Sequence, residues 1–369
     1  MHRRAFVGTL ASLPLGAALA ARQQSGSPEG LRYGGSLHPP GSPEGLRYGE
    51  SSKTIRPRRL AAGDTVGLVA PASATFQSVD LDIARESLQA LGLKVKVGRH
   101  LLGRHGYLAG ADKDRAEDIN GFFKDDDVRA VLPIRGGWGS ARVLPYLDFD
   151  AIRKHPKILL GYSDITALLL SVHARTGLVT FHGPNGLGRW DAWSVEYLKR
   201  VLFGAEAVTM ENPRSMSDRN SLVQIENRVR TVTPGKARGR LLGGNLTVLT
   251  AILGSPYVPS WDGAILFCED VGEDLYRIDR MFTQLKLAGA LAKIRGFVFG
   301  TCSECGPGDG YASLTLEEIL ADHIKPLGVP AWSGAMIGHA TPQWTVPVGA
   351  DVDIDATSGT ITMVAPAVQ

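Results

Sequence analysis

The chain has 369 residues, of which 44% are hydrophobic and 21% are charged. This length favours two domains, and the composition excludes a collagen, a coiled coil or a wholly disordered protein. Residues 1–60 hold nine of the 40 basic and three of the 37 acidic residues, which leaves 31 basic and 34 acidic residues in the body. Nucleic acid is therefore not expected as a partner, because binding phosphates requires a basic surface.

The first 21 residues have the pattern of an export signal. Arg3-Arg4 precedes an apolar stretch that reaches Ala18-Leu-Ala20, small residues that a signal peptidase accepts. The arginine pair favours the twin-arginine route, and a Sec signal or an uncleaved anchor is the alternative. We therefore expect a periplasmic or otherwise exported protein. No later apolar run approaches the roughly 20 residues of a membrane span, so no span is expected in the body.

Residues 22–52 contain a repeated segment. The sequence GSPEGLRYG occurs at 26–34 and again at 41–49. Gly, Pro and Ser at this density bury too little apolar surface to offset the entropy of ordering. The segment is predicted to be a flexible tether, with a partner-binding repeat as the alternative.

Residues 53–204 alternate between strand and helix patterns. Strands are predicted at 65–70, 93–97, 128–134 and 158–161, and helices at 79–91, at 112–124 and through Val143. Regular alternation of this kind predicts an α/β fold with a Rossmann-like, parallel-sheet domain.

The hydrophobic pattern weakens over residues 205–235, which we interpret as a connection between domains. A second, smaller β-containing domain is predicted for 236–369. Its expected elements are strands at 264–267 and 296–300, a helix around 280–291 and a β-rich tail from Val346.

Ser163 occupies the most distinctive local motif. Gly161-Tyr-Ser-Asp164 follows an apolar strand and begins a helix, so that the serine is predicted at a tight strand-to-helix turn. A nucleophile at such a turn lies beside free helix N–H groups that stabilise an oxyanion. A simple helix cap is the alternative. The motif is not Gly-x-Ser-x-Gly, which argues against a standard α/β-hydrolase.

A glycine-rich turn follows another predicted strand. Arg135-Gly-Gly-Trp-Gly139 lacks the dinucleotide and phosphate-loop signatures. Glycines here let a backbone approach a ligand closely and offer N–H groups to an anion. A structural tight turn is the alternative.

Three acidic residues and one histidine are further candidates for catalytic residues. Glu269 is predicted at the end of an apolar strand, where an acid can orient a histidine, and Asp270 and Glu273 follow it. An exposed loop acid is the alternative for all three. His339 lies in the loop Gly338-His-Ala340, where a structural or solvated histidine is the alternative. Of the remaining histidines, none of His173, His182 and His323 has a comparable setting.

Taken together, these motifs resemble the LD-carboxypeptidases, serine peptidases that trim peptidoglycan tetrapeptides. The resemblance rests on an ordered series of segments: 70–73, 135–139, 161–166, 181–184, 243–246, 254–257, 269–270 with Tyr276 and Arg280, and 338–339 followed by 347–349. It implies a triad of Ser163, Glu269 and His339. We expect the backbone N–H groups of Asp164 and Gly137 to form the oxyanion hole, and no metal or cofactor to be required.

The same resemblance implies hydrolysis of the L,D amide that releases terminal D-Ala from a tetrapeptide, and a homodimer. Two other functions stay open. An immunity-type peptidase would cleave peptidyl or aminoacyl nucleotides, for which Trp190 and Trp193 are candidate stacking residues, and a non-catalytic protein would only bind peptidoglycan. The chain departs from familiar members in its export and tether segment, in Cys268 where Leu is usual, and in Trp138 where Tyr is common.

Cys302 and Cys305 have CxxC spacing. Without a second pair of ligands a zinc site is not expected, whereas a disulfide formed after export is compatible with the spacing.

Overall fold

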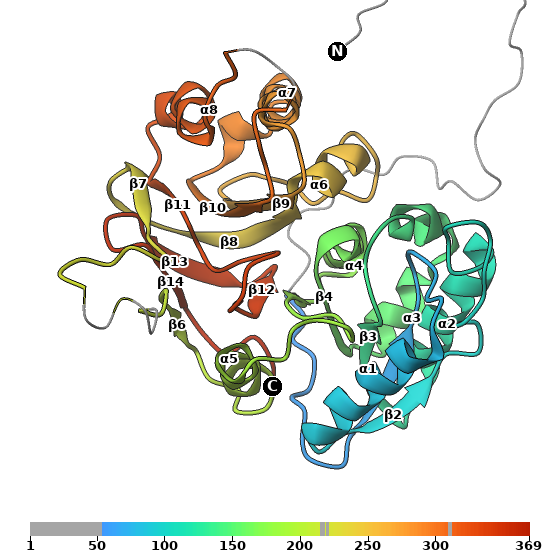
Figure 1. Cartoon of the computed structure of the whole chain (residues 1–369). Coiled ribbons are helices and arrows are strands. Elements are labelled where there is room, and N and C mark those ends of the chain that lie inside the picture. The colour runs from blue at the N-terminus through green and yellow to red at the C-terminus, as the bar shows by residue number, and fades with distance from the viewer. Residues whose placement is uncertain (1–53, 215–217, 219–220, 309–311) are drawn as a thin grey trace, which may run out of the picture. The chain divides into compact units, whose positions relative to one another are not determined.

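The computed structural model describes residues 54–214, 218, 221–308 and 312–369, all of which belong to one unit (Figure 1). The predicted export signal and tether lie outside the described residues. Within the described ranges, no helix is long and apolar enough to cross a membrane.

The first sheet is built largely as predicted. Its strand order is β12-β5-β4-β3-β1-β2, and the five strands from the N-terminal half are parallel to their neighbours. These strands are β1 (Thr65–Val69), β2 (Lys94–Val97), β3 (Val128–Pro133), β4 (Ile158–Gly161) and β5 (Thr180–His182). The sixth strand, β12 (Val346–Val348), comes from the C-terminal part of the chain and runs antiparallel to β5.

Helices connect these strands. The predicted ones are α1 (Ser78–Ala90), α2 (Asp112–Lys124) and α4 (Thr166–Thr176), whereas the short α3 (Phe149–Lys154) was not predicted. The helix predicted through Val143 is the 3-10 segment η1 (Ser140–Tyr146), which contains Pro145. Proline lacks the N–H that a longer α-helix would need there.

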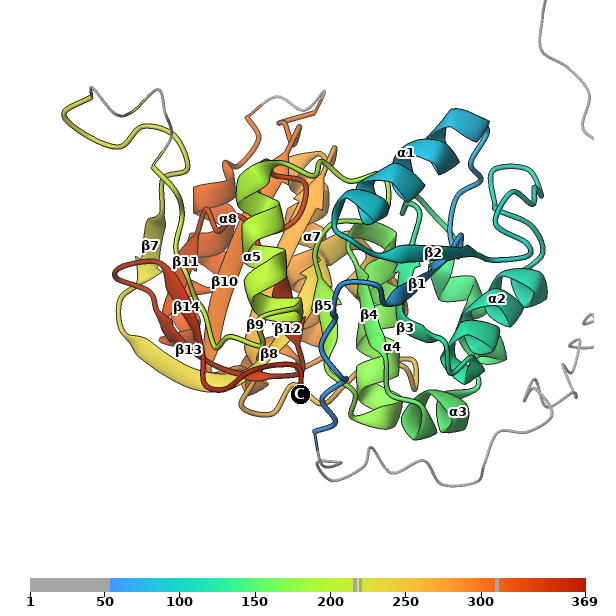
Figure 2. The ribbon, with the colours of Figure 1, turned by 90° about the horizontal axis from the view of Figure 1, so that it is seen from below.

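The second sheet has the order β6-β14-β13-β8-β9-β10-β11-β7. Its parallel centre consists of β8 (Lys236–Asn245), β9 (Ile265–Val271), β10 (Gly296–Ser303) and β11 (Ala331–Ser333). Antiparallel strands flank it: β6 (Thr209–Met210), β7 (Arg230–Thr233), β13 (Asp351–Asp355) and β14 (Thr360–Met363). Helices α6 (Leu246–Ile252), α7 (Leu275–Leu287) and α8 (Leu316–His323) follow strands of this sheet along the chain, and α5 (Ala192–Leu202) precedes β6. In the view of Figure 2, α5 lies in front of the strands of the second sheet.

The segment 205–235, expected as a connection, also supplies the two edge strands β6 and β7. An edge strand is paired on one side only, so it does not need the apolar pattern by which a central strand is identified in the sequence.

Helix α4 joins the two sheets, because it packs against β4 and β5 of the first sheet and against β8 of the second. Buried apolar side chains of both sheets form one continuous core cluster. The backbone N–H of Asn245 donates to Thr166 Oγ1 at 2.9 Å, and a Cβ at Gly244 would lie only 2.4 Å from that oxygen. The close approach of β8 to the start of α4 therefore depends on a glycine.

Candidate active site

Ser163 lies at a strained turn between a strand and a helix. Strand β4 ends at Gly161, and Ser163 begins the 3-10 segment η2 (Ser163–Ile165), which continues directly into α4. The φ angle of Ser163 is 65°, a left-handed conformation that side chains other than glycine adopt rarely. This is the geometry expected of a nucleophile elbow.

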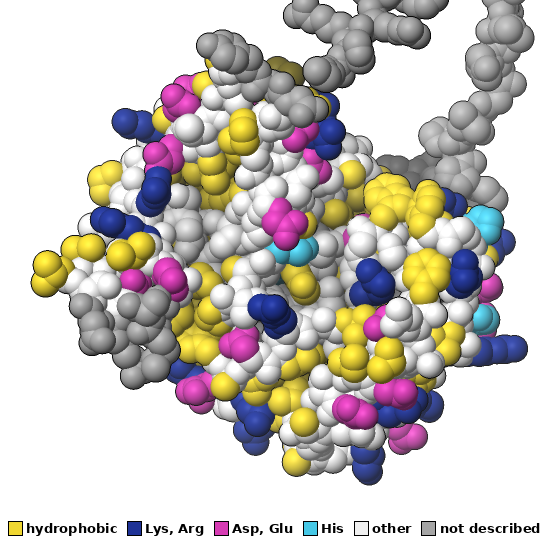
Figure 3. All heavy atoms as spheres, in the orientation of Figure 1, with side chains coloured by type: hydrophobic (Ala, Val, Ile, Leu, Met, Phe, Trp, Pro, Cys, Tyr) yellow, Lys and Arg dark blue, Asp and Glu magenta, His cyan; other side chains and the backbone are white. Residues whose placement is uncertain are grey.

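The structure brings the three predicted triad residues together. His339 Nε2 lies 3.2 Å from Ser163 Oγ, and His339 Nδ1 lies 2.8 Å from Glu269 Oε2. Glu269 is fully buried, whereas 19% of the His339 side chain is exposed. Figure 3 shows a histidine and an acidic side chain near the centre of the face that it draws; Glu269 is buried, so it is not the acid seen there. The serine comes from the first sheet, and its two partners are held by elements of the second.

The hydrogen bonds define which nitrogen of His339 carries the proton. A carboxylate accepts hydrogen bonds only, so Nδ1 donates to Glu269 and Nε2 is left as an acceptor for the Ser163 hydroxyl. Burial lowers the pKa of His339, but the hydrogen bond and charge of Glu269 raise it, and the net pKa is raised. For Glu269, burial raises the pKa, but the imidazoles of His182 and His339 outweigh it and lower the pKa to about 2.

His182 is a residue of this site that our sequence analysis missed. It is fully buried at the end of β5, and its Nε2 lies 3.7 Å from Glu269 Oε1. This distance exceeds an ordinary hydrogen bond, so the interaction is mainly electrostatic. Its position at the carboxyl end of a strand could have identified it, because β5 lies next to β4 and His182 pairs in register with Gly161. Polar residues at the carboxyl ends of adjacent parallel strands converge on one site.

The glycine-rich turn lies against the Ser163 hydroxyl. A Cβ at Gly136 would lie 3.3 Å from Ser163 Oγ and 3.3 Å from the backbone nitrogen of Asp164. Any larger residue would fill the space in which a substrate oxygen could meet backbone N–H groups. Gly137 has a φ of 108°, which also favours glycine.

Three polar side chains hold this turn in place. The carboxylate of Asp164 accepts a hydrogen bond from the Ser140 backbone N–H at 2.7 Å, and the Ser140 hydroxyl donates to the Asp164 carbonyl. Ser73 Oγ accepts from the backbone N–H of Trp138 at 3.0 Å, while the Trp138 side chain is exposed. The turn is therefore held from both ends.

Strand β9 extends further than predicted. It continues to Val271, so Glu269 and Asp270 are both inside the strand and their side chains lie on opposite faces. Asp270 is buried, so the alternative of an exposed loop acid is wrong for both residues. β8 and β10 pair with β9 at these positions, and this pairing outweighs the weak strand propensity of acidic residues.

Asp270 has a separate set of partners. It accepts hydrogen bonds from Asn245 Nδ2 at 3.0 Å and from the N–H and hydroxyl of Thr247, both at 2.9 Å. Burial raises its pKa to about 6, and the charge of Glu269 adds to this. Glu273 contacts Thr247 and Arg277, and neither acid is hydrogen-bonded to His339.

The three cysteines have different roles in the structure. Cys302 and Cys305 form a disulfide at the end of β10. Within the turn that it closes, the Ser303 hydroxyl donates to the backbone carbonyl of His339 at 3.0 Å. Cys268 is a buried free thiol whose pKa is raised by burial, so it is not a reactive nucleophile.

One group of described residues has the spacing of metal ligands. Donor atoms of His100, Asp114 and Glu117 lie within 4.8 Å of one another. None of the three belongs to the Ser163 site.

Two family models match the chain. The LD-carboxypeptidase N-terminal domain matches residues 66–183, and the LD-carboxypeptidase C-terminal domain matches residues 238–354. The chain belongs to the LD-carboxypeptidase family. It is a serine-type carboxypeptidase, which confirms the resemblance seen in the sequence.

Relatives of this LD-carboxypeptidase include proteins with two kinds of name. It is 42% identical over 304 residues to a probable murein peptide carboxypeptidase of Bacillus subtilis, covering 81% of this chain and 91% of the relative. It is 32% identical over 293 residues to the murein tetrapeptide carboxypeptidase of Pseudomonas aeruginosa, covering 77% and 91%.

The microcin C7 self-immunity protein MccF of Escherichia coli is 32% identical over 327 residues, covering 80% of this chain and 92% of the relative. A structure of MccF in complex with glutamyl sulfamoyl guanosine matches with a TM-score of 0.77 at 28% identity, covering 85% of this chain and 99% of the other. The α/β fold of this LD-carboxypeptidase is therefore shared with MccF.

Proposed function

We propose that this LD-carboxypeptidase hydrolyses the amide between an L-centre, such as that of meso-diaminopimelate, and the terminal D-Ala of a murein tetrapeptide. The observation that carries the proposal is the continuous chain of hydrogen bonds from Ser163 through His339 to Glu269. The names of the murein carboxypeptidase relatives support the substrate.

In this mechanism Ser163 Oγ attacks the carbonyl carbon while His339 Nε2 takes its proton. Glu269 holds the imidazole in the required tautomer and stabilises its cation. The tetrahedral oxyanion accepts hydrogen bonds from the backbone N–H groups of Asp164 and Gly137. His339 then donates the proton to the leaving D-Ala amine, and water hydrolyses the acyl enzyme by the same route.

Turnover of a synthetic tetrapeptide by the wild type and by Ser163→Ala tests the proposal. Release of D-Ala by the wild type, reduced by about 10⁶-fold in the variant, is expected. Release of D-Ala by both proteins at equal rates would contradict the role of Ser163.

An immunity-type peptidase is the second candidate, supported by the likeness to MccF. The two tryptophans that could stack a nucleobase are engaged within the protein. Trp190 Nε1 donates to the Gly186 carbonyl at 3.1 Å, and the Trp193 ring lies 4.3 Å from that of Tyr197. Cleavage of an aminoacyl sulfamoyl nucleotide in preference to tetrapeptide would select this candidate, and binding of tetrapeptide without turnover would indicate the non-catalytic alternative.

Export by the twin-arginine route and assembly as a homodimer are also proposals. The first rests on Arg3-Arg4 and the apolar segment that follows. Replacing both arginines by lysine should leave the protein in the cytoplasm, whereas normal periplasmic recovery would favour a Sec signal. Sedimentation equilibrium of the purified body tests the dimer.

A further inference from the structure

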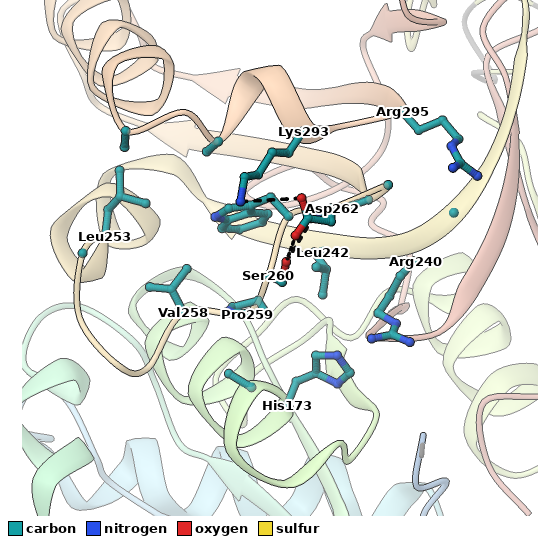
Figure 4. Close-up of a pocket in the computed structure, with 18 of the residues that line it drawn as sticks. His173, Arg240, Leu242, Leu253, Val258, Pro259, Ser260, Asp262, Lys293 and Arg295 are labelled. Carbon is teal, nitrogen blue, oxygen red and sulfur yellow. Dashed lines mark hydrogen bonds and ion pairs between the residues drawn. The ribbon is translucent and has the colours of Figure 1, made fainter. Parts of the chain in front are cut away.

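A cavity lies at the ends of α4 and β9 that are remote from Ser163 and Glu269. Its volume is about 830 Å³, and we call it the α4–β8 pocket (Figure 4). Helix α4 begins beside Ser163, and its last turn lines the pocket with His173. Strand β9 carries Glu269 near its end, and Ala264, the residue directly before its start, lines the pocket.

Some charged side chains that line the α4–β8 pocket form an ion pair, and others do not. Lys293 Nζ lies 3.5 Å from Asp262, the ion pair drawn in Figure 4. Arg240 and Arg295 have no ion-pair or hydrogen-bond partner among the described residues, and Asp351 is the remaining charged residue of the lining. The groups outside the ion pair therefore carry two positive charges and one negative charge.

Arg240 has an unpartnered donor in this pocket, and Asp351 lies opposite it on the neighbouring strand β13 at a distance beyond an ion pair. The Nε of Arg240 is buried and has no hydrogen-bond partner in the described structure. A buried N–H group left without an acceptor is costly, and a guanidinium group matches the geometry of carboxylate and phosphate oxygens.

His173 complements this donor with an acceptor. Its Nδ1 lies 3.0 Å from the carbonyl of Leu178, which can only accept, so Nδ1 carries the proton and Nε2 is an acceptor. Burial lowers the pKa of His173 to about 4, so the ring is neutral at physiological pH. Figure 4 shows His173 and Arg240 projecting toward one another across the pocket.

We propose that the α4–β8 pocket binds a small ligand that carries a carboxylate or phosphate group. The oxyanion accepts hydrogen bonds from Arg240, with Arg295 adding positive charge, and His173 Nε2 accepts from an N–H or O–H of the ligand. Leu242, Val258 and Pro259 provide apolar surface for the rest of the molecule. Cavities of this volume are typical of small-molecule sites.

Binding at this pocket would contact both sheets at once. Ser163 lies between β4 of the first sheet and α4, and Glu269 is part of β9 in the second sheet. A ligand that connects the far ends of α4 and β9 restricts the movement of one relative to the other, and thereby biases the distance between Ser163 and Glu269, the acid that orients His339.

Isothermal titration of the purified protein with inorganic phosphate and with citrate tests the proposal. We expect one site of millimolar affinity for at least one probe, weakened about tenfold or more in Arg240→Gln. Binding of phosphate alone would assign a phosphate ligand, and binding of citrate alone a carboxylate. Failure of both probes to bind at about 10 mM would overturn the proposal.

Two further variants keep the test decisive. Arg238→Gln removes the same charge two residues earlier on β8, where Arg238 is paired with Asp353 outside this pocket, and it should bind the probe normally. Equal weakening in Arg238→Gln and Arg240→Gln would indicate general charge attraction and reject the site. If Arg240→Gln does not fold, Arg295→Gln provides the comparison. The titration contains no tetrapeptide and measures no hydrolysis. A failure to bind the probes would therefore not bear on the proposed hydrolysis.

Discussion

Gly338, next to His339 in the chain, leaves room for the side chain of Glu269. A Cβ at Gly338 would lie 2.2 Å from Glu269 Oε2, the oxygen that accepts the hydrogen bond from His339. The φ of Gly338 is 93°, so both its backbone and its surroundings require glycine.

Gly338→Ala should therefore lose about a hundredfold in kcat and about 1 to 3 kcal/mol of stability, because Glu269 or the loop must move. The measurements are tetrapeptide turnover and denaturant unfolding. Gly63→Ala is the control, since Gly63 also has a positive φ but nothing lies within 4 Å of its Cβ position. Normal turnover in Gly338→Ala would show that Glu269 need not be held where the structure places it.

Glu269→Gln should fold normally and lose about 10³ to 10⁴ in kcat, because the imidazole loses its orienting carboxylate. Glu273→Gln is the matched control. It makes the same change at an acid that contacts Thr247 and Arg277 and not His339, and near-normal kcat is expected. The reverse result would replace Glu269 by Glu273 as the orienting acid.

The pH profile of kcat/KM should report the ionisation of His339. Glu269 stays ionised because its pKa is about 2, whereas the pKa of His339 is raised. Protonated His339 cannot accept the serine proton, so activity should rise with pH through a midpoint above the ordinary imidazole value of about 6.5. In Glu269→Gln this midpoint should move to lower pH. An unchanged midpoint would mean that another group limits the reaction.

Opening the disulfide turn should loosen the His339 loop. The double variant Cys302→Ser, Cys305→Ser should lower kcat by about two- to tenfold, the worth of one hydrogen bond such as that from Ser303 to the His339 carbonyl. Ser303→Ala removes that bond while the disulfide remains, so it should give a similar loss. Full activity in both variants would show that the turn does not support His339.

The sequence alone determined the local parts of this protein. The period-2 and period-3.6 patterns of the first half predicted α2 and β4 with the bounds that the structure has, because these patterns record which face of an element is buried. The position of Ser163 at a strand-to-helix turn was predicted for the same reason. The family resemblance then named Glu269 and His339, which the spacing of residues could not have selected from the other acids and histidines.

Only the tertiary structure decided what depends on neighbours distant in sequence. The burial of Asp270 follows from the strands on both sides of β9, and the place of His182 beside Glu269 follows from strand order in the first sheet. The edge strands β6 and β7 and the returning strand β12 likewise acquire their structure from their partners. Local propensity contains no information on these contacts, since pairing and burial are set by residues more than 20 positions away along the chain.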